Sequence, residues 1–308
     1  MKGKLTYVLT CGLLLAALAG GSCVKQGLDL REQVGYVRID LQWENGSVPE
    51  GSEFYFYNEN GERVHSCICA AEGFRGTLPI GKYKIIVWNT DAENLELFGM
   101  DNYASAVVRV TADETAANRD GGYIAQPDNL LLASAFNEAE FMEVPYRDSV
   151  IMSASPKGLV KKVHLVFKVD NADAVKLVSG SLSGVSSGVQ CSSVSCTNDP
   201  RSVNFAIKQE NFSQTYDYSA DISVLDLVLP AGGVSGSHVL TLDAVVDGVT
   251  YHMNIDLTGT IDDLLKGEWN GTIPIEIPLE VELKSIDGIL SAEVKPWDNT
   301  GTGGGEIM

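Results

Sequence analysis

The chain has 308 residues, of which 44% are hydrophobic and 20% charged, and its formal net charge at pH 7 is −19. This apolar content suffices for one large core or two ordinary ones and excludes a wholly disordered protein. The acidic balance argues against binding to nucleic acid and against direct adsorption to anionic lipid.

The N-terminus has the pattern of a bacterial lipoprotein signal. Lys2 and Lys4 precede an apolar run over residues 5–18, and small residues at 19–22 precede Cys23. The run is too short to cross about 30 Å of hydrocarbon comfortably as a helix. We therefore predict that residues 1–22 are removed and that Cys23 carries fatty acid such as palmitate. The alternatives are an ordinary signal peptide and an uncleaved membrane anchor.

Removal of residues 1–22 takes away two lysines, so the mature chain has 20 basic and 41 acidic residues and a net charge of −21.

The rest of the chain alternates apolar and polar residues with a period of two, in short runs interrupted by Gly, Asn, Asp or Pro. This period is typical of antiparallel strands with one buried face. Two short helices are expected, at residues 112–118 and 260–267, the second with Thr260 as its cap and Gly267 as its stop. The predicted strands are residues 34–43, 53–57, 83–88, 106–110, 159–169, 204–208, 222–229, 239–246, 251–257, 275–283 and 290–294. The sequence thus predicts an all-β protein.

Two tandem antiparallel β-sandwich domains are expected, with a boundary near residue 156. The strongest breaks in the strand pattern fall at residues 144–148 and 153–158. The expected organisation is a signal peptide at 1–22, a lipid-anchored linker at 23–33, an N-terminal sandwich at 34–156, a C-terminal sandwich at 157–297 and a Gly-rich flexible tail at 298–308.

Each half contains a similar step between strands. Residues 78–83 read Leu-Pro-Ile-Gly-Lys-Tyr, and residues 229–233 read Leu-Pro-Ala-Gly-Gly. In both, proline ends one strand and glycine supplies a turn with positive φ. The repetition indicates two sandwiches of one general plan.

Four of the six cysteines lie beyond the predicted lipidation site. Cys67 and Cys69 are two residues apart, so on a strand their side chains share one face. Cys191 and Cys196 flank a loop-like segment that a disulfide between them can close. His65-x-Cys67-x-Cys69 supplies only one side of a tetrahedral zinc site, so no metal is predicted. The disulfide state of all four cysteines stays open.

The sequence contains no recognisable catalytic set. The Gly-x-Ser-x-Gly, phosphate-loop and His-Glu-x-x-His motifs are absent from it. Acidic pairs such as Asp262-Asp263 are plentiful in so acidic a chain, and acidic turn residues such as Asp91 are expected to be solvated rather than to bind calcium. Each histidine lies in or beside a strand-like run, at positions 65, 164, 238 and 252. We therefore predict that the protein is not an enzyme and needs no cofactor.

Several of these features together resemble a known family. They are the lipoprotein cysteine Cys23, a first strand ending in Trp43, the Leu-Pro-Ile-Gly-Lys-Tyr step into residues 85–89, a second all-β half and Val-Lys-Pro-Trp at 294–297. The combination resembles the fimbrillin-like lipoproteins of the Bacteroidales, in particular FimB-type fimbrial anchor subunits and related lipoproteins.

The resemblance implies two transthyretin-like β-sandwiches and a fimbrial anchor or accessory role. It also implies that the lipid on Cys23 anchors the protein in the outer membrane, on the cell surface. It implies that fimbrial or other surface subunits are partners and that assembly proceeds by β-strand addition. The strand at residues 34–43 is the expected assembly region, because it lies next to the anchor and has a long alternating apolar face; the alternative is that it is an ordinary paired strand. Arg31 and Arg147 are candidate protease maturation sites, and the Gly-rich end argues against donation of a C-terminal strand. The alternatives are a surface lipoprotein that binds glycans or host ligands, with Trp88, Trp269, Trp297, Tyr55 and Tyr57 as candidate aromatic platform, and a structural lipoprotein that faces the periplasm.

Substitution of the predicted lipid attachment site tests the signal. The Cys23→Ala variant is expected to lose fatty-acid labelling and to leave the membrane fraction, because stable anchoring needs the acyl chains. Metabolic labelling with a fatty acid and fractionation of cell envelopes measure both effects. Labelling and membrane association equal to those of the wild type would contradict the assignment.

Overall fold

The computed structural model describes residues 33–44, 48–116, 122–134, 141–170, 175–210, 216–229, 237–246, 248–270, 272–286 and 289–296. Within these ranges the regular elements are strands, apart from helix α2 (Thr258–Lys266) and a 3-10 turn at Glu114–Ala116. The predicted all-β sandwich class is confirmed. Cys23, Arg31, Trp297, the signal peptide and the Gly-rich tail lie outside the described residues, so the predictions about them stay predictions.

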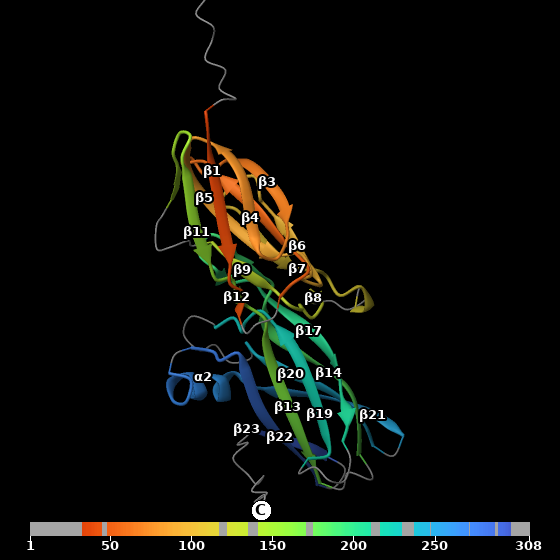
Figure 1. Cartoon of the computed structure of the whole chain (residues 1–308). Coiled ribbons are helices and arrows are strands. Elements are labelled where there is room, and N and C mark those ends of the chain that lie inside the picture. The colour runs from red at the N-terminus through yellow and green to blue at the C-terminus, as the bar shows by residue number, and fades with distance from the viewer. Residues whose placement is uncertain are drawn as a thin grey trace, which may run out of the picture.

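The N-terminal half contains a sandwich of two sheets (Figure 1). In one sheet, β1 lies between β11, which runs parallel to it, and β4, which runs antiparallel. The other sheet has the order β12-β9-β5-β2-β3, and β10 pairs with the beginning of β5. Apolar side chains from both sheets, among them Ile39, Phe54 and Phe74, fill the space between them. The bounds are β1 Val34–Leu41, β2 Ser52–Tyr57, β3 Arg63–Cys69, β4 Gly73–Pro79, β5 Gly81–Asn89, β9 Leu131–Ala133, β10 Met142–Val144, β11 Ser149–Ala154 and β12 Lys157–Gly158.

Strand β2 is buried on both faces. Phe54 and Phe56 belong to the core that β1 covers, whereas Tyr55 and Tyr57 belong to a second, larger core. Alternate side chains of a strand point to opposite faces, so a strand covered on both sides reads as a continuous apolar run. A further layer must therefore cover the far side of this sheet.

That further layer is a four-stranded sheet of order β16-β15-β7-β6, built from strands on both sides of residue 156. Val108 of β7 is the register partner of Val189 of β15. Both side chains are 0% exposed and lie in the same core as Tyr57. The two halves of the molecule therefore share a sheet as well as a core. The bounds are β6 Leu95–Phe98, β7 Val107–Val110, β15 Gly188–Gln190 and β16 Ser195–Cys196.

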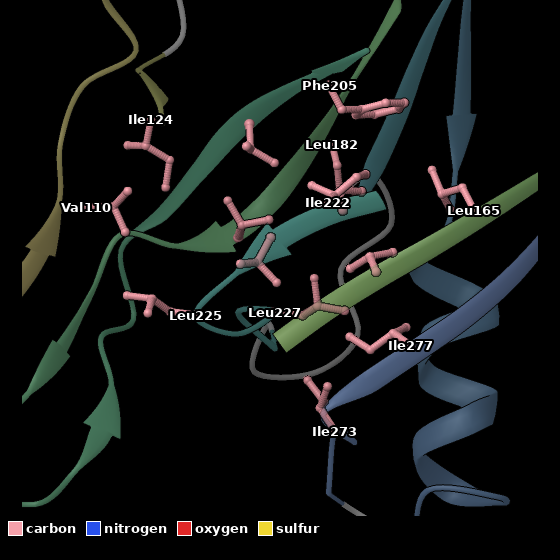
Figure 2. Packing of buried hydrophobic residues seen from close by; sticks show 14 of the residues in the cluster. Val110, Ile124, Leu165, Leu182, Phe205, Ile222, Leu225, Leu227, Ile273 and Ile277 are labelled. Atoms are coloured by element: carbon pink, nitrogen blue, oxygen red, sulfur yellow. The ribbon is translucent and has the colours of Figure 1, made fainter. Parts of the chain in front are cut away.

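The C-terminal half is a sandwich of two five-stranded sheets, of order β18-β19-β13-β22-β23 and β21-β20-β14-β17-β8 (Figure 1). Leu165, Leu182 and Ile222 pack between these sheets (Figure 2). Helix α2 buries Ile261 and Leu264 against the same core. The bounds are β8 Tyr123–Ile124, β13 Lys161–Val169, β14 Val175–Ser186, β17 Pro200–Ala206, β18 Lys208–Gln209, β19 Tyr218–Val224, β20 Val239–Val246, β21 Val249–Asp256, β22 Glu276–Ile286 and β23 Ile289–Pro296.

The structure differs from the sequence prediction in three details. The pairs β1–β11, β13–β22 and β17–β8 are parallel, so the sheets are mixed rather than purely antiparallel. Strand β11 and the 12-residue strand β14 were not predicted, and in β14 serines and glycines interrupt the apolar residues. Helix α2 begins at Thr258 rather than after a Thr260 cap, although Gly267 does follow its last turn.

The predicted boundary at residue 156 lies in the link between β11 and β12. Strand β8, from the N-terminal side, also completes a C-terminal sheet by pairing with β17. Strands therefore cross the boundary in both directions. Independent folding of the two halves stays a prediction, and the shared sheets favour a single unfolding transition instead.

A core substitution on the N-terminal side tests this coupling. Leu132 is 1% exposed and lies in the larger core, so Leu132→Ala is expected to lower the free energy of unfolding by about 2–5 kcal/mol. Near- and far-ultraviolet circular dichroism should show one transition shifted as a whole. Ile68→Ala, at an exposed position, is the control, with an expected change below about 0.5 kcal/mol. Two separate transitions, of which only one moves, would support independent domains.

Candidate functional site

The histidines lie in separate structural settings. The His65 ring stacks on Phe56 with centroids 5.7 Å apart, and His164 Nδ1 lies 2.5 Å from an Asp221 carboxylate oxygen. His252 pairs across strands with Asp243, and His238 is buried, which lowers its pKa through desolvation. In the part of the chain that the structure describes, no three His, Cys, Asp or Glu side chains gather in a way that could hold a metal ion.

The four described cysteines are free thiols. Cys67 and Cys69 share a face of β3, as predicted, with their sulfur atoms 3.6 Å apart. Cys196 Sγ donates to the Leu225 carbonyl, and Cys191 is fully buried. Burial raises the pKa of both Cys191 and Cys196 to about 12, so both thiols stay protonated. The disulfide between Cys191 and Cys196 stays a prediction.

The candidate aromatic platform is largely inside the protein. Tyr55, Tyr57 and Trp269 are buried. Trp88 is half-buried, and its indole N–H donates to Glu53 at 2.8 Å. Among the described residues these side chains therefore offer no shared exposed surface on which a sugar ring could stack.

Strand β1, the expected assembly region, is not available for pairing. β11 occupies one of its edges and β4 the other. Its alternating pattern was identified correctly, but this pattern reports a buried face and not a free edge. Strand addition requires a strand that ends a sheet, so the assignment to residues 34–43 was wrong.

Sheet edges leave backbone donors and acceptors unpaired, and natural proteins protect them with charge, proline or bulges. β4 and β23 follow this rule, with Arg75 and Pro79 in the first and Lys295 and Pro296 in the second. Three edge strands carry long uncharged stretches instead: β3 from residue 64 to 69, β11 from 149 to 154, and β21 from 249 to 255. These three are the candidate edges for a partner strand.

β21 has the longest uncharged stretch of the three. It pairs with β20 along its whole length and ends the sheet on its other side. His252 Nδ1 lies 2.6 Å from Asp243 Oδ1, and Thr241 Oγ1 donates to Asn254 at 2.9 Å, so cross-strand pairs on the outer face hold β21 in register. A preformed edge of fixed register is what a partner strand needs.

The inner face of β21 is incompletely covered. Tyr251, Met253 and Ile255 are register partners of Ala244, Leu242 and Leu240 on β20, all of which are fully buried. Tyr251 itself is 39% exposed, and Met253 and Ile255 are half-buried. The row of apolar side chains therefore continues from the core to the edge, where further apolar side chains can pack against it.

The position of β21 separates it from the other two candidates. Figure 1 shows β21 in the half of the molecule far from the beginning of β1. β11 lies directly beside β1. At the beginning of β3, the Arg63 amide donates to Asp101, so the neighbouring loop covers part of that edge. β21 is thus an accessible edge far from the beginning of β1.

No helix in the described ranges is long and apolar enough to cross a membrane.

Alkylation of the unreduced, denatured protein tests the cysteine assignment. If Cys191 and Cys196 are free, as in the structure, iodoacetamide will modify both, and mass spectrometry of their peptides will show two added groups. In the native protein Cys191 is expected to react much more slowly, because its burial and raised pKa suppress the thiolate. A peptide in which both cysteines take up iodoacetamide only after reduction would establish the predicted disulfide.

Known proteins share this fold. The chain is 23% identical over 317 residues to a Bacteroides ovatus protein named "Putative fimbrium anchoring subunit Fim4B", and the match covers 95% of this chain and 91% of the relative. A structure of "a putative adhesin" from Bacteroides ovatus superposes with a TM-score of 0.59 at 19% identity, over 79% of this chain and 89% of that one. The fimbrial anchor protein Mfa2 from Porphyromonas gingivalis superposes with a TM-score of 0.52 at 13% identity, over 85% of this chain and 96% of that one.

These comparisons confirm the similarity to Bacteroidales fimbrial anchor proteins that the sequence indicated. Residues 22–206 also match a protein family, and the match extends across residue 156 into β17. Because the matched residues make up more than half of the chain, the protein belongs to the family described as "Domain of unknown function (DUF5119)".

Proposed function

We propose that this protein is a lipid-anchored lipoprotein of the outer membrane, exposed on the cell surface, that acts as a fimbrial anchor or accessory subunit. Its partners are other fimbrial or surface subunits, and it holds them by β-strand addition without catalysing a reaction. The similarity to the fimbrium anchoring subunit over nearly the whole length of both chains supports the role. The predicted lipid on Cys23 supplies the attachment.

The observation that carries the proposed mechanism is the free edge of β21. A partner strand placed beside it can form hydrogen bonds with the unpaired backbone groups of the edge. Its alternate side chains can pack against the half-covered row of Tyr251, Met253 and Ile255. β21 also lies far from the beginning of β1, so a partner bound there stays clear of the end where the chain enters that strand (Figure 1).

A charged side chain in the apolar row on the inner face of β21 should prevent a partner strand from binding. Natural edges are protected by inward-pointing charges, so Tyr251→Lys is expected to lower the amount of partner subunit that co-purifies from native membranes by at least about tenfold, equivalent to roughly 1.4 kcal/mol. Quantitative mass spectrometry of the purified complex measures this, and a thermal melt checks that the variant is folded. Ile68→Lys, on the β3 edge, is the matched control and should leave co-purification unchanged. If Ile68→Lys lowers co-purification of the partner subunit and Tyr251→Lys does not, the partner binds the β3 edge and not the β21 edge.

Deletion of the gene from its native host tests the anchor role itself. Without an anchor, fibres should detach, so microscopy should show fewer fibres on cells and more fibre protein in the medium. Fibres of unchanged number, length and attachment would argue for the ligand-binding alternative.

A further inference from the structure

The end of the molecule where β1 begins is formed by three chain segments that backbone hydrogen bonds hold together. The Ile80 amide donates to the Gln33 carbonyl, and the Arg147 amide donates to the Val34 carbonyl. Gly35 permits this close approach, because a Cβ atom there would lie 2.2 Å from the Pro145 carbonyl oxygen. We call this end, comprising residues 33–38, 75–82 and 145–151, the anchor-side tip.

Large apolar side chains gather at the anchor-side tip and face solvent. Tyr36 is 63% exposed, Ile80 40%, Tyr146 51% and Ile151 65%. None of the four belongs to either hydrophobic core. Isolated apolar residues on a surface need no explanation, but a group on adjacent segments marks an interaction site.

Two of these residues line a groove on the outer face of the sheet β11-β1-β4. The groove has a volume of 360 Å³, and the residues that line it include Tyr36, Arg38, Arg75, Thr77 and Ile151. In register, Arg38 lies between Ile151 and Arg75, and Tyr36 lies between Ser149 and Thr77. The face thus carries apolar surface with guanidinium groups beside it.

The charges of the anchor-side tip set it apart from the rest of this acidic chain. Arg38 and Arg75 share one carboxylate, Asp40, at 2.9 and 3.8 Å. Arg147 lies over the ring of Tyr146, 5.0 Å from its centroid. Asp148 follows Arg147 in the sequence, and Lys82 lies opposite Glu143 in register and 3.7 Å from a Glu59 carboxylate oxygen. The tip therefore carries no excess of negative charge, whereas the whole chain has a net charge of −19.

The covalent chain places this surface near the predicted lipid. Ten residues, from Val24 to Gln33, separate Cys23 from the beginning of β1. Even fully extended, ten residues span at most about 36 Å. The anchor-side tip is thus the part of the described structure closest along the chain to the membrane that holds the lipid.

We propose that the anchor-side tip rests in the headgroup layer of the membrane into which the lipid on Cys23 inserts. The proposal rests on the proposed lipidation of Cys23. Tyrosine rings suit this layer because one end is apolar and the other polar, and arginine stems lie along apolar surface while their guanidinium groups bind lipid phosphates. The net negative charge of the chain opposes its adsorption from solution to anionic lipid. The acyl chains nevertheless hold the anchor-side tip at the membrane surface. Because the tip has no excess of negative charge, anionic lipid repels it less than it repels the rest of the chain. The contact turns the β21 edge away from the membrane (Figure 1).

Hydroxyl-radical footprinting of the full mature chain tests this contact. The lipidated protein is reconstituted in vesicles of phosphatidylethanolamine and phosphatidylglycerol, and the Cys23→Ser protein in the same buffer without vesicles is the reference. Oxidation of Tyr36 and Tyr146 is expected to slow by at least about threefold on the vesicles, because the headgroup layer excludes water from side chains that are otherwise exposed. Tyr251 and Ile68, which are also exposed and lie outside the tip, are internal controls and should keep their rates.

A double substitution provides the second arm. Tyr146→Ser with Ile151→Ser removes half of the apolar group and should restore fast oxidation of Tyr36 while the protein still floats with the vesicles. Unchanged oxidation of Tyr36 and Tyr146 in wild-type protein that floats with the vesicles would overturn the proposal and leave the lipid anchor intact. Absence of acyl mass on Cys23 would overturn the anchor and, with it, the proposal.

Discussion

The burial of β2 on both of its faces is the constraint on which the rest of the structure depends. Phe54 and Phe56 fill the core beneath β1, and Tyr55 and Tyr57 fill the core that continues into the C-terminal half. A sheet that is apolar on both sides needs a cover on each side. β7 and β15, one from each half of the chain, supply the second cover. This shared cover joins the two sandwiches through one sheet and one core.

The sequence predicted those strands whose burial follows a simple alternation. β1, β5, β13 and β20 lie close to their expected ranges, because each places every second residue in a core. β14 was missed because its glycines look like turn signals. In the structure, a Cβ atom on Gly180 would lie 2.4 Å from the Phe205 ring, and Gly184 has a φ of +77° at an irregularity of the strand. These glycines are required by close packing within a strand, and a single sequence does not distinguish that use from a turn.

The candidate site was predictable only in part, for a related reason. The sequence shows that β1 and β21 are both strands, and it cannot show that β1 is central and β21 an edge, because neighbours in a sheet are set by contacts distant in sequence. The lack of charged residues between 249 and 255 was a usable signal. Its meaning depends on the edge position, since a central strand is also uncharged. For the four-stranded sheet shared by the two halves, no short-range pattern links Val108 with Val189.

The position of β1 has a mechanical consequence. In the proposed role, the subunit is held at one end by lipid and at the other by a fibre and transmits tension along its length. The chain enters the sheet at the beginning of β1. β1 is held by β11 on one side and by β4 on the other over nearly its whole length. A pull along the axis of β1 loads these backbone hydrogen bonds in shear, so that many must break together, whereas a pull across the strands would open them one at a time. The strand that proved unsuitable for recruiting a partner is for this reason well suited to resist extraction under flow.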